Sequence, residues 1–272
     1  MKIKRRDILL AISVIITSLW ILLPIYWIFK TSLCIPGKEQ TFPLEYFPTT
    51  FYYQNYLELP KEFPVWMGNS LIISSISTII TLILAINVAF GIVYLKYRFC
   101  IATLIFFLIT GWLPYIGIVY PVFIIQKTLN LLGTHLGLIL PYVPLGLGFA
   151  IWILTSWLIG TPRELFEAAI LDGCSPIQIL WKIYVPNSGP GLLSAGLLLF
   201  ISYYQEYMIA SVINPTGTKT LMVGLETLSL GIYVRNWAAL CAAMIYALIP
   251  VILIVLFGRK WIISGITGIV KR

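Results

Sequence analysis

The side chains able to perform acid–base or metal chemistry are few in this chain. Among its 272 residues His135 is the single histidine, and Asp7 and Asp172 are the two aspartates. An H-E-x-x-H metal site needs two histidines, and the G-x-S-x-G motif of a serine nucleophile does not occur. The G-x-x-x-x-G-K-[ST] loop that cradles nucleotide phosphates does not occur either. The sequence therefore disfavours an enzyme and predicts that this chain does not bind ATP by itself.

The main group of polar side chains inside an apolar stretch is Tyr203, Tyr204, Gln205 and Glu206, and Asn69 stands at the start of another such stretch. Aromatic faces combined with amide and carboxylate hydrogen bonds are the chemistry that holds sugars. We therefore predict that these residues line a substrate path. Two alternatives stay open, because an aromatic run in an apolar helix is usually packing and Glu206 could be a hydrogen-bonding group at a helix end.

A second polar concentration, RELFEAAILDGCSPIQILWKIYVPNS, starts at Arg163 between two long apolar runs. Before it, Thr161 is placed to cap a helix, with Pro162 at the first helical position and Glu164 three residues after the cap. This spacing is that of a capping box. Asp172-Gly173 is expected to end the helix, because glycine accepts the left-handed conformation at a helix C-terminus.

A second helix start follows at once. Ser175 is the expected cap, Pro176 the first helical residue and Gln178 the third residue after the cap, and the helix is predicted to stop before Pro186. Two capping boxes contribute about 1 kcal/mol each, which is more local structure than a passive connector needs. The apolar faces of both helices are covered either by the chain's own helix ends or by a partner protein, and the residues leave both open.

The elements that carry these groups are long and apolar. The chain is 60% hydrophobic and 10% charged, with a mean hydropathy of +0.95, whereas soluble domains are about 25% charged. A helix of about 20 apolar residues crosses a hydrocarbon layer. We predict an all-α membrane protein with six transmembrane helices in a single domain over residues 1–272. The spans are 8–29, 70–94, 101–125, 136–160, 189–214 and 237–258.

Lysine and arginine placement predicts the orientation, because these residues favour the cytoplasmic side of a membrane. With the N-terminus inside, the inner segments hold twelve of them and the outer segments six. Both termini and residues 161–188 are therefore expected in the cytoplasm. The same bias and anionic lipid explain the net charge of +8 without a nucleic acid. Cys34, Cys100, Cys174 and Cys241 are predicted to be free thiols.

Residues 167–190 resemble the EAA loop of ABC importer permeases. The family pattern is E-A-A, two further residues, D-G, and an apolar helix that ends in I-x-L-P before a further proline. The matching residues are Glu167, Ala168, Ala169, Asp172, Gly173, Ile183, Pro186 and Pro190. An isolated E-A-A would be weak, but the full spacing is specific. Cys174 stands in place of the usual alanine, and Val185 in place of leucine.

Other stretches are similar to the carbohydrate-type permeases, the branch of the maltose-system MalG inner-membrane subunits. They are WMGNSLIIS (66–74) at the second span, YRF (97–99) after it, YYQEY (203–207) in place of W-N-E-F/Y, and the closing SGITGIVKR (264–272). Together these matches cover nearly the whole chain at the expected spacing. The Tyr-Tyr-Gln sequence in place of the W-N pattern leaves the class of sugar open.

The resemblance implies a six-helix ABC importer permease in the inner membrane of a prokaryotic cell. Such a permease moves a sugar or sugar-like solute inward by alternating access. Its implied partners are a second permease subunit, two cytoplasmic ATPase subunits that hold ATP and Mg, and an extracytoplasmic solute-binding protein. No cofactor is expected on this chain.

The resemblance also assigns an ATPase interface, with residues 161–188 as the coupling loop. In it Glu167 would meet a basic or polar partner group, and Gly173 would set the turn. The two alanines after Glu167 would allow close approach. The expected interface residues are Glu164, Glu167, Ala168, Ala169, Asp172, Gly173, Ser175, Pro176 and Pro186 in the loop, and Gly265, Gly268 and Lys271 in the tail.

Two other transport functions stay open. The first is an ABC permease for another solute, such as glycerol phosphate. The second is a secondary transporter driven by an ion gradient, which normally carries intramembrane acids. Glu206 is the one acid within the six predicted spans, so it is the candidate proton relay for that alternative.

Overall fold

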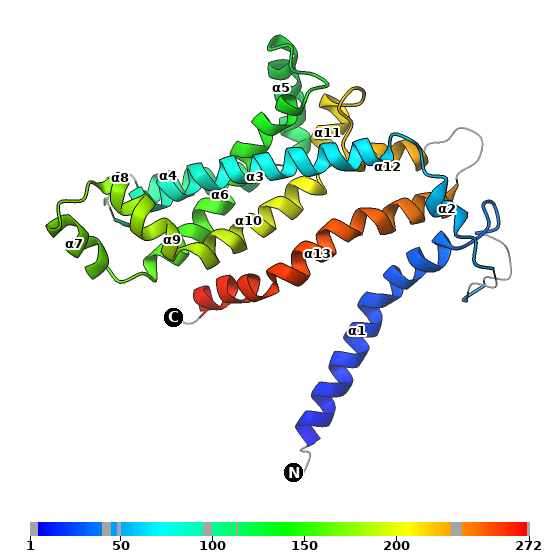
Figure 1. The fold of residues 1–272 in the computed structure, drawn as a ribbon, viewed down its shortest axis with the longest axis horizontal. Coiled ribbons are helices and arrows are strands. Elements are labelled where there is room, and N and C mark those ends of the chain that lie inside the picture. The colour runs from blue at the N-terminus through cyan, green and yellow to red at the C-terminus, as the bar shows by residue number, and fades with distance from the viewer. Residues whose placement is uncertain are drawn as a thin grey trace. The chain divides into compact units, whose positions relative to one another are not determined.

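The computed structural model describes residues 5–39, 45–47, 50–94, 100–112, 114–229 and 236–270, with side chains described except at 5–7, 100, 110, 112 and 261–270. Every regular element within these ranges is helical (Figure 1). In chain order the elements are α1 (Arg5–Ser32), α2 (Gln54–Leu57), α3 (Phe63–Val93), α4 (Cys100–Trp112), α5 (Tyr115–Thr128), α6 (His135–Ile159), α7 (Glu164–Leu171), α8 (Pro176–Ile179), the π-helical turn η1 (Leu180–Tyr184), α9 (Val185–Asn187), α10 (Gly189–Tyr204), α11 (Met208–Ile213), α12 (Leu221–Ser229) and α13 (Trp237–Val270).

Four of the described helices are long and apolar enough to cross a membrane: α1, α3, α6 and α13. They carry the predicted spans 8–29, 70–94, 136–160 and 237–258 almost from end to end. A further candidate is formed by the helical stretches Pro176–Asn187 and Gly189–Tyr204, which are bent by 78° at Ser188. The chain is therefore an all-helical, multi-pass membrane protein, as its composition predicted.

The predicted span 101–125 is not one helix. α4 ends at Trp112, α5 begins at Tyr115, and Pro114 before it has an extended backbone with φ −64° and ψ 126°. The helix breaks there because proline has no N–H to donate to the preceding turn. The predicted span 189–214 is also divided, since α10 ends at Tyr204 and α11 begins only at Met208.

The chain forms two compact units. Unit 1 comprises Met1–Phe63 and Gly224–Ile249, and unit 2 comprises Pro64–Val223 and Pro250–Arg272. In unit 1 the Asn55 amide donates hydrogen bonds to the carbonyls of Ser32 and Cys34, at 2.9 and 2.8 Å. Those bonds fix α2 to the end of α1. Cys34, Cys174 and Cys241 are free thiols, as predicted, and the side chain of Cys100 lies outside those described.

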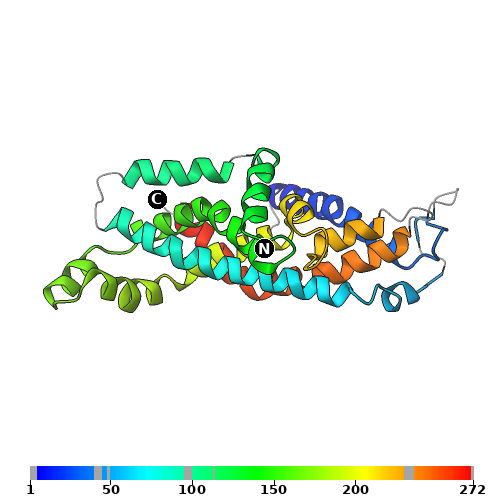
Figure 2. The ribbon, with the colours of Figure 1, turned by 90° about the horizontal axis from the view of Figure 1, so that it is seen from above.

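The centre of unit 2 is α6, along which both α4 and α10 pack (Figure 2). Leu138, Ala150, Ile151 and Leu154 of α6 are fully buried. The approach of α4 is close because residue 148 is glycine: a Cβ atom there would overlap the Phe107 carbonyl of α4. Backbone contact of this kind is how small residues permit tight helix pairs inside a membrane.

Gly148→Ala is expected to destabilise the protein by about 1–3 kcal/mol, because the added methyl group must push α4 away from α6. Gly91→Ala on α3 is the matched control, since its Cβ meets nothing within 4 Å. That change should be neutral or stabilising, because alanine favours a helix over glycine by about 1 kcal/mol. Thermal unfolding of both purified variants in detergent measures the difference, and equal midpoints would contradict the predicted contact.

Candidate functional site

Residues 161–188, here called the 161–188 segment, lie at one end of unit 2, where α7 and α8 project beyond the long helices (Figure 1). The first predicted capping box is wrong. α7 begins at Glu164 with Arg163 as its N-cap, and no side chain caps it. Thr161 instead belongs to the end of α6, since its N–H donates to the Leu158 carbonyl at 3.0 Å.

The predicted turn at Asp172-Gly173 is confirmed. Gly173 has φ +78°, in the left-handed region that glycine accepts without strain. Its N–H donates to the Ile170 carbonyl at 2.9 Å, and the N–H of Cys174 donates to the Ala169 carbonyl at 3.0 Å. These two bonds make a complete Schellman motif, which closes the end of α7.

The second predicted capping box is also confirmed. The Gln178 N–H donates to Ser175 Oγ at 3.4 Å, and the Ser175 N–H donates to Gln178 Oε1 at 2.9 Å. Pro176 occupies the first turn of α8, where its missing N–H is not needed. α7 and α8 are therefore joined by a connection of four residues whose two ends are both hydrogen-bonded.

The prediction that this second helix stops before Pro186 is wrong. α8 continues as the π-helical turn η1 and then as α9, which contains Pro186 and ends at Asn187. A proline in an α-helix clashes with the carbonyl four residues earlier. Here the wider π-helical turn lies just before the proline, and turns of this kind bulge the helix. The sharp bend comes instead at Ser188, before α10.

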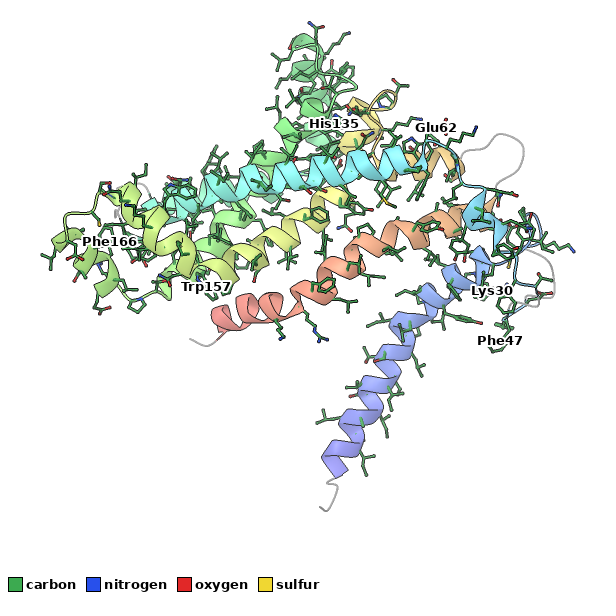
Figure 3. The ribbon with its side chains drawn as sticks, viewed as in Figure 1. Lys30, Phe47, Glu62, His135, Trp157 and Phe166 are labelled. Atoms are coloured by element: carbon green, nitrogen blue, oxygen red, sulfur yellow. The ribbon has the colours of Figure 1, made fainter. Side chains whose placement is uncertain are left out.

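A cluster of aromatic rings packs the segment against the long helices of unit 2. Phe166 of α7, labelled in Figure 3, stacks on Tyr94 with centroids 5.3 Å apart and lies 6.0 Å from Phe90. Tyr184 of η1 lies 4.4 Å from Tyr94 and 5.5 Å from Phe90. The Tyr94 hydroxyl donates to the Leu158 carbonyl at 3.0 Å. The cluster therefore ties both halves of the segment to the ends of α3 and α6.

Much of the rest of the segment is exposed. Leu171 is 88% exposed and Ile177 65% exposed, large values for apolar side chains. Eight of the predicted interface residues are exposed: Glu164, Glu167, Ala168, Asp172, Gly173, Ser175, Pro176 and Pro186. Ala169 differs, because it is only 4% exposed and packs in the chain's own core. The chain's own helices therefore cover part of the apolar surface of the segment, and cover of the exposed part by a partner protein stays a prediction.

Glu167 also makes an ion pair within α7. Its Oε1 lies 3.5 Å from Arg163 Nε, with both side chains at least half exposed. Exposed pairs of this kind contribute about 0–1 kcal/mol, so the carboxylate can exchange Arg163 for a cation on another protein. In the predicted tail, Gly265 and Gly268 lie in the last turns of α13, and Lys271 lies outside the described residues.

The Glu206 carboxylate accepts three hydrogen bonds at the break between α10 and α11. Its carboxylate accepts hydrogen bonds from the N–H groups of Ile209 and Ala210, at 2.7 and 3.1 Å, and from the Tyr142 hydroxyl at 2.6 Å. The backbone bonds satisfy N–H groups that the start of α11 leaves without helical partners. Hydrogen bonding at a helix end, one of the two alternatives drawn from the sequence, is thus what Glu206 does in this structure.

The other predicted path residues divide into separate groups. Tyr203 stacks on Tyr142 at 5.4 Å and 11°, and its hydroxyl shares a hydrogen bond with Thr81 at 3.0 Å. Tyr204 is buried against Phe200, and Gln205 is exposed. Asn69 instead bonds His135, which Figure 3 labels, and the Lys219 carbonyl, at 3.0 and 2.9 Å.

Sequence reasoning missed Tyr142, which links Glu206 to Tyr203, and it missed the aromatic cluster beneath the 161–188 segment. A signal for Tyr142 existed, because a tyrosine hydroxyl in an apolar helix needs a hydrogen-bonding partner. Glu206 is the acid available within the predicted spans. Nothing in the sequence indicated which rings would meet in the cluster, since they come from three elements and the residue after α3.

The chain is similar over nearly its whole length to permease proteins of known transport systems. It is 32% identical to the sulfoquinovosyl glycerol transport system permease protein SmoH of Agrobacterium fabrum, over 91% of this chain and 87% of the relative. It is also 32% identical to the trehalose/maltose transport system permease protein MalG of Thermococcus litoralis, over 97% of this chain and 96% of the relative. No protein-family model matches the chain.

A solved structure shares the fold. It is a chain of a bacterial ABC transporter involved in the import of the acidic polysaccharide alginate, and the superposition has a TM-score of 0.79. It covers 96% of this chain and 99% of that chain, at 23% sequence identity. The fold of this protein is therefore that of an ABC importer permease.

Ser175→Ala should loosen α8, because the N-cap bond contributes about 1 kcal/mol. Amide hydrogen exchange in residues 176–180, measured by mass spectrometry on the purified protein, is expected to speed up about fivefold, the factor equivalent to that energy. Thr161→Ala is the matched control, since Thr161 makes no capping bond to α7. Faster exchange in α7 of the control variant would contradict the observed helix start.

Proposed function

Since the chain belongs to the family of sugar ABC transporter permeases, we propose that it is a membrane subunit through which such an importer moves a sugar or sugar-like solute into the cell. The observation that carries the proposal is that the 161–188 segment is partly packed against the chain's own helices and partly exposed. The exposed part presents carboxylates and apolar side chains. A cytoplasmic ATPase subunit is the partner expected on that part.

The segment is suited to transmit force because its two helices are short, are joined by a hydrogen-bonded turn and pack against the long helices. The Schellman turn and the capping box limit bending between α7 and α8. The aromatic cluster connects α7 and η1 to the ends of α3 and α6. A displacement by the ATPase would therefore move those helices together, and closing the ATPase pair would shift the permease between its two facings.

The remaining parts of the proposal follow from this role. ATP and Mg are held by two ATPase subunits, and this chain binds no cofactor and catalyses no reaction. It pairs with a second permease subunit as a heterodimer and receives solute from an extracytoplasmic binding protein. We propose six crossings of the inner membrane of a prokaryotic cell, with α4 and α5 forming one broken crossing and both termini in the cytoplasm. Tyr203, Tyr204, Gln205, Glu206 and Asn69 remain proposed contributors to the solute path.

Glu167→Lys and Gly173→Val are expected to abolish import while the protein inserts at normal abundance. The first reverses the charge of the exposed carboxylate. The second forces a β-branched residue to φ +78°, at a cost of about 1–3 kcal/mol that the turn avoids by changing shape. Uptake of labelled sugar by cells carrying the complete transporter measures the loss, with immunoblots of membranes for abundance.

The matched controls repeat each change away from the 161–188 segment. Glu62→Lys makes the same charge reversal at an exposed site in unit 1, and Gly37→Val strains a glycine at φ +86° with nothing within 4 Å. Both controls should retain import. Normal uptake by the two segment variants would refute the coupling role, and equal loss in the controls would show that charge or strain acts anywhere in the chain.

The proposed orientation predicts that Cys174, which is half-buried in the 161–188 segment, reacts with a membrane-impermeant maleimide from the cytoplasmic side alone. Cys34 and Cys241 are buried and should react slowly from either side, and Cys100→Ala removes the fourth thiol. Labelling in inside-out but not right-side-out vesicles is expected. The reverse pattern would place the segment outside the cell.

A further inference from the structure

Unit 2 contains a partly open cavity of about 540 Å³ lined by residues of α4, α5, α6 and α10. Its walls include Tyr115 of α5, Phe149 and Trp152 of α6, and Ser202 and Tyr203 of α10. Ligand sites in proteins typically occupy about 300–1,000 Å³. The cavity is therefore large enough for a small ligand, and Tyr203 is the one wall residue that the sequence had already singled out.

The walls combine ring faces with hydroxyl groups. Tyr115, Phe149 and Trp152 are 45, 37 and 44% exposed, so the chain's own packing leaves part of each ring open. Tyr115, Ser202 and Tyr203 of these walls carry hydroxyl groups. The Ser202 hydroxyl donates to the Leu198 carbonyl at 2.9 Å and the Tyr203 hydroxyl shares a hydrogen bond with Thr81, and each oxygen can still accept a further bond. The C–H face of a sugar ring packs on aromatic rings while its hydroxyl groups need polar partners at the edge. Rings with hydroxyl oxygens beside them fit a sugar, whose own hydroxyl groups can donate to those oxygens, whereas a lipid chain has no donor to offer them.

The wall formed by Tyr203 is held in place before any ligand arrives. Its ring stacks on Tyr142, and its hydroxyl bonds Thr81. Gly146 lies directly against it, and a Cβ atom there would overlap the Tyr203 hydroxyl. A wall positioned in this way loses little conformational freedom on binding, which favours affinity.

The lack of charged side chains in the described lining of the cavity favours a neutral sugar over an anionic one. None of the described wall residues is charged. The acid connected to the wall is Glu206, which accepts a hydrogen bond from Tyr142, the residue stacked on Tyr203. A sulfonate or a uronic acid entering this cavity would lose its hydration without gaining a cationic partner, at a large cost in free energy. A neutral sugar would not meet that cost.

We propose that this cavity binds a ring of a neutral glycoside, so that the importer carries a neutral saccharide in preference to sulfonated or uronic-acid sugars. The proposal rests on the proposed function and narrows it. Among the similar proteins, the permease of Thermococcus litoralis is named for trehalose and maltose, which are neutral sugars. The other two proteins are named for sulfoquinovosyl glycerol and alginate, which are anionic. The uncharged walls that the structure describes in this chain suit a neutral solute and offer an anionic one no cationic partner.

The first experiment measures uptake by the complete transporter, with its binding protein, in proteoliposomes. The substrates are labelled neutral disaccharides (trehalose and maltose among them), sulfoquinovosyl glycerol and an oligouronate. Import of a neutral disaccharide is expected, with Trp152→Ala lowering its rate about tenfold because a stacking ring is lost. Phe106→Ala is the matched control on α4, since Phe106 is 63% exposed and is not a wall residue. It should import at the normal rate.

The second experiment tests occupancy directly. Ser202→Cys is introduced into a complex whose four native cysteines in this chain are replaced by alanine, and the rate of maleimide labelling is measured with and without the imported sugar. The neutral sugar should slow labelling at least threefold, whereas labelling of Phe106→Cys in the same background should not change. This readout does not depend on transport, so it stands even where Trp152→Ala folds poorly.

The outcomes separate the two proposals. If the unaltered transporter imports no sugar of any class, the proposed function fails. If it imports anionic sugars in preference to neutral ones, or if the neutral sugar leaves labelling of Ser202→Cys unchanged, the cavity proposal is overturned and the importer role stands. A Ser202→Cys thiol already closed to maleimide without sugar also overturns it, because the partner permease or lipid would then fill the cavity.

Discussion

The packing of aromatic rings from Phe90, Tyr94, Phe166 and Tyr184 joins the 161–188 segment to the membrane helices, and the proposed coupling role of that segment depends on it. Without this packing, α7 and α8 would be short amphipathic helices on a loop, too short to be stable alone in water. With it, they become an extension of α3 and α6. Several residues of the segment outside this cluster stay exposed, Leu171 among them, and they are the surface on which we propose that the ATPase docks.

The need to satisfy backbone hydrogen bonds explains the irregular helices elsewhere in unit 2. An apolar layer offers no water to an unpaired N–H, so a broken helix inside it needs side-chain partners. At the break between α10 and α11, Glu206 supplies those partners and Tyr142 holds Glu206 in turn. A carboxylate occupied in this way is an anchor, and this argues against the secondary transporter in which Glu206 would relay protons.

The 161–188 segment and the cavity are connected to the same helices, α6 and α10. Near its C-terminal end α6 accepts a hydrogen bond from Tyr94 of the aromatic cluster at Leu158, and roughly one to three turns earlier it carries Trp152 and Phe149 of the cavity wall. α10 begins after the bend at Ser188 and ends with Tyr203 and Tyr204. Under the proposed function, a movement imposed on the 161–188 segment would reach the cavity along α6, which is one continuous helix from Phe149 to Leu158.

The sequence by itself determined the features that depend on neighbouring residues. Composition was enough to identify a multi-pass helical membrane protein. The turn at Gly173 and the capping box of Ser175 and Gln178 were predictable because their donors and acceptors lie within a few residues of one another. The permease family could be identified for the same reason, since its motif is a continuous stretch.

Tertiary structure decided what depends on distant partners. Thr161 finishes α6 rather than starting α7, because the course of the chain from α6 decides which carbonyl its N–H meets. Ala169 faces the core while the adjacent Ala168 faces outward, as the packing of α7 on α3 requires. The pairing of Tyr142 with Glu206 joins residues 64 positions apart. The cavity exists only where four helices meet, and no local pattern specifies which side chains will face it.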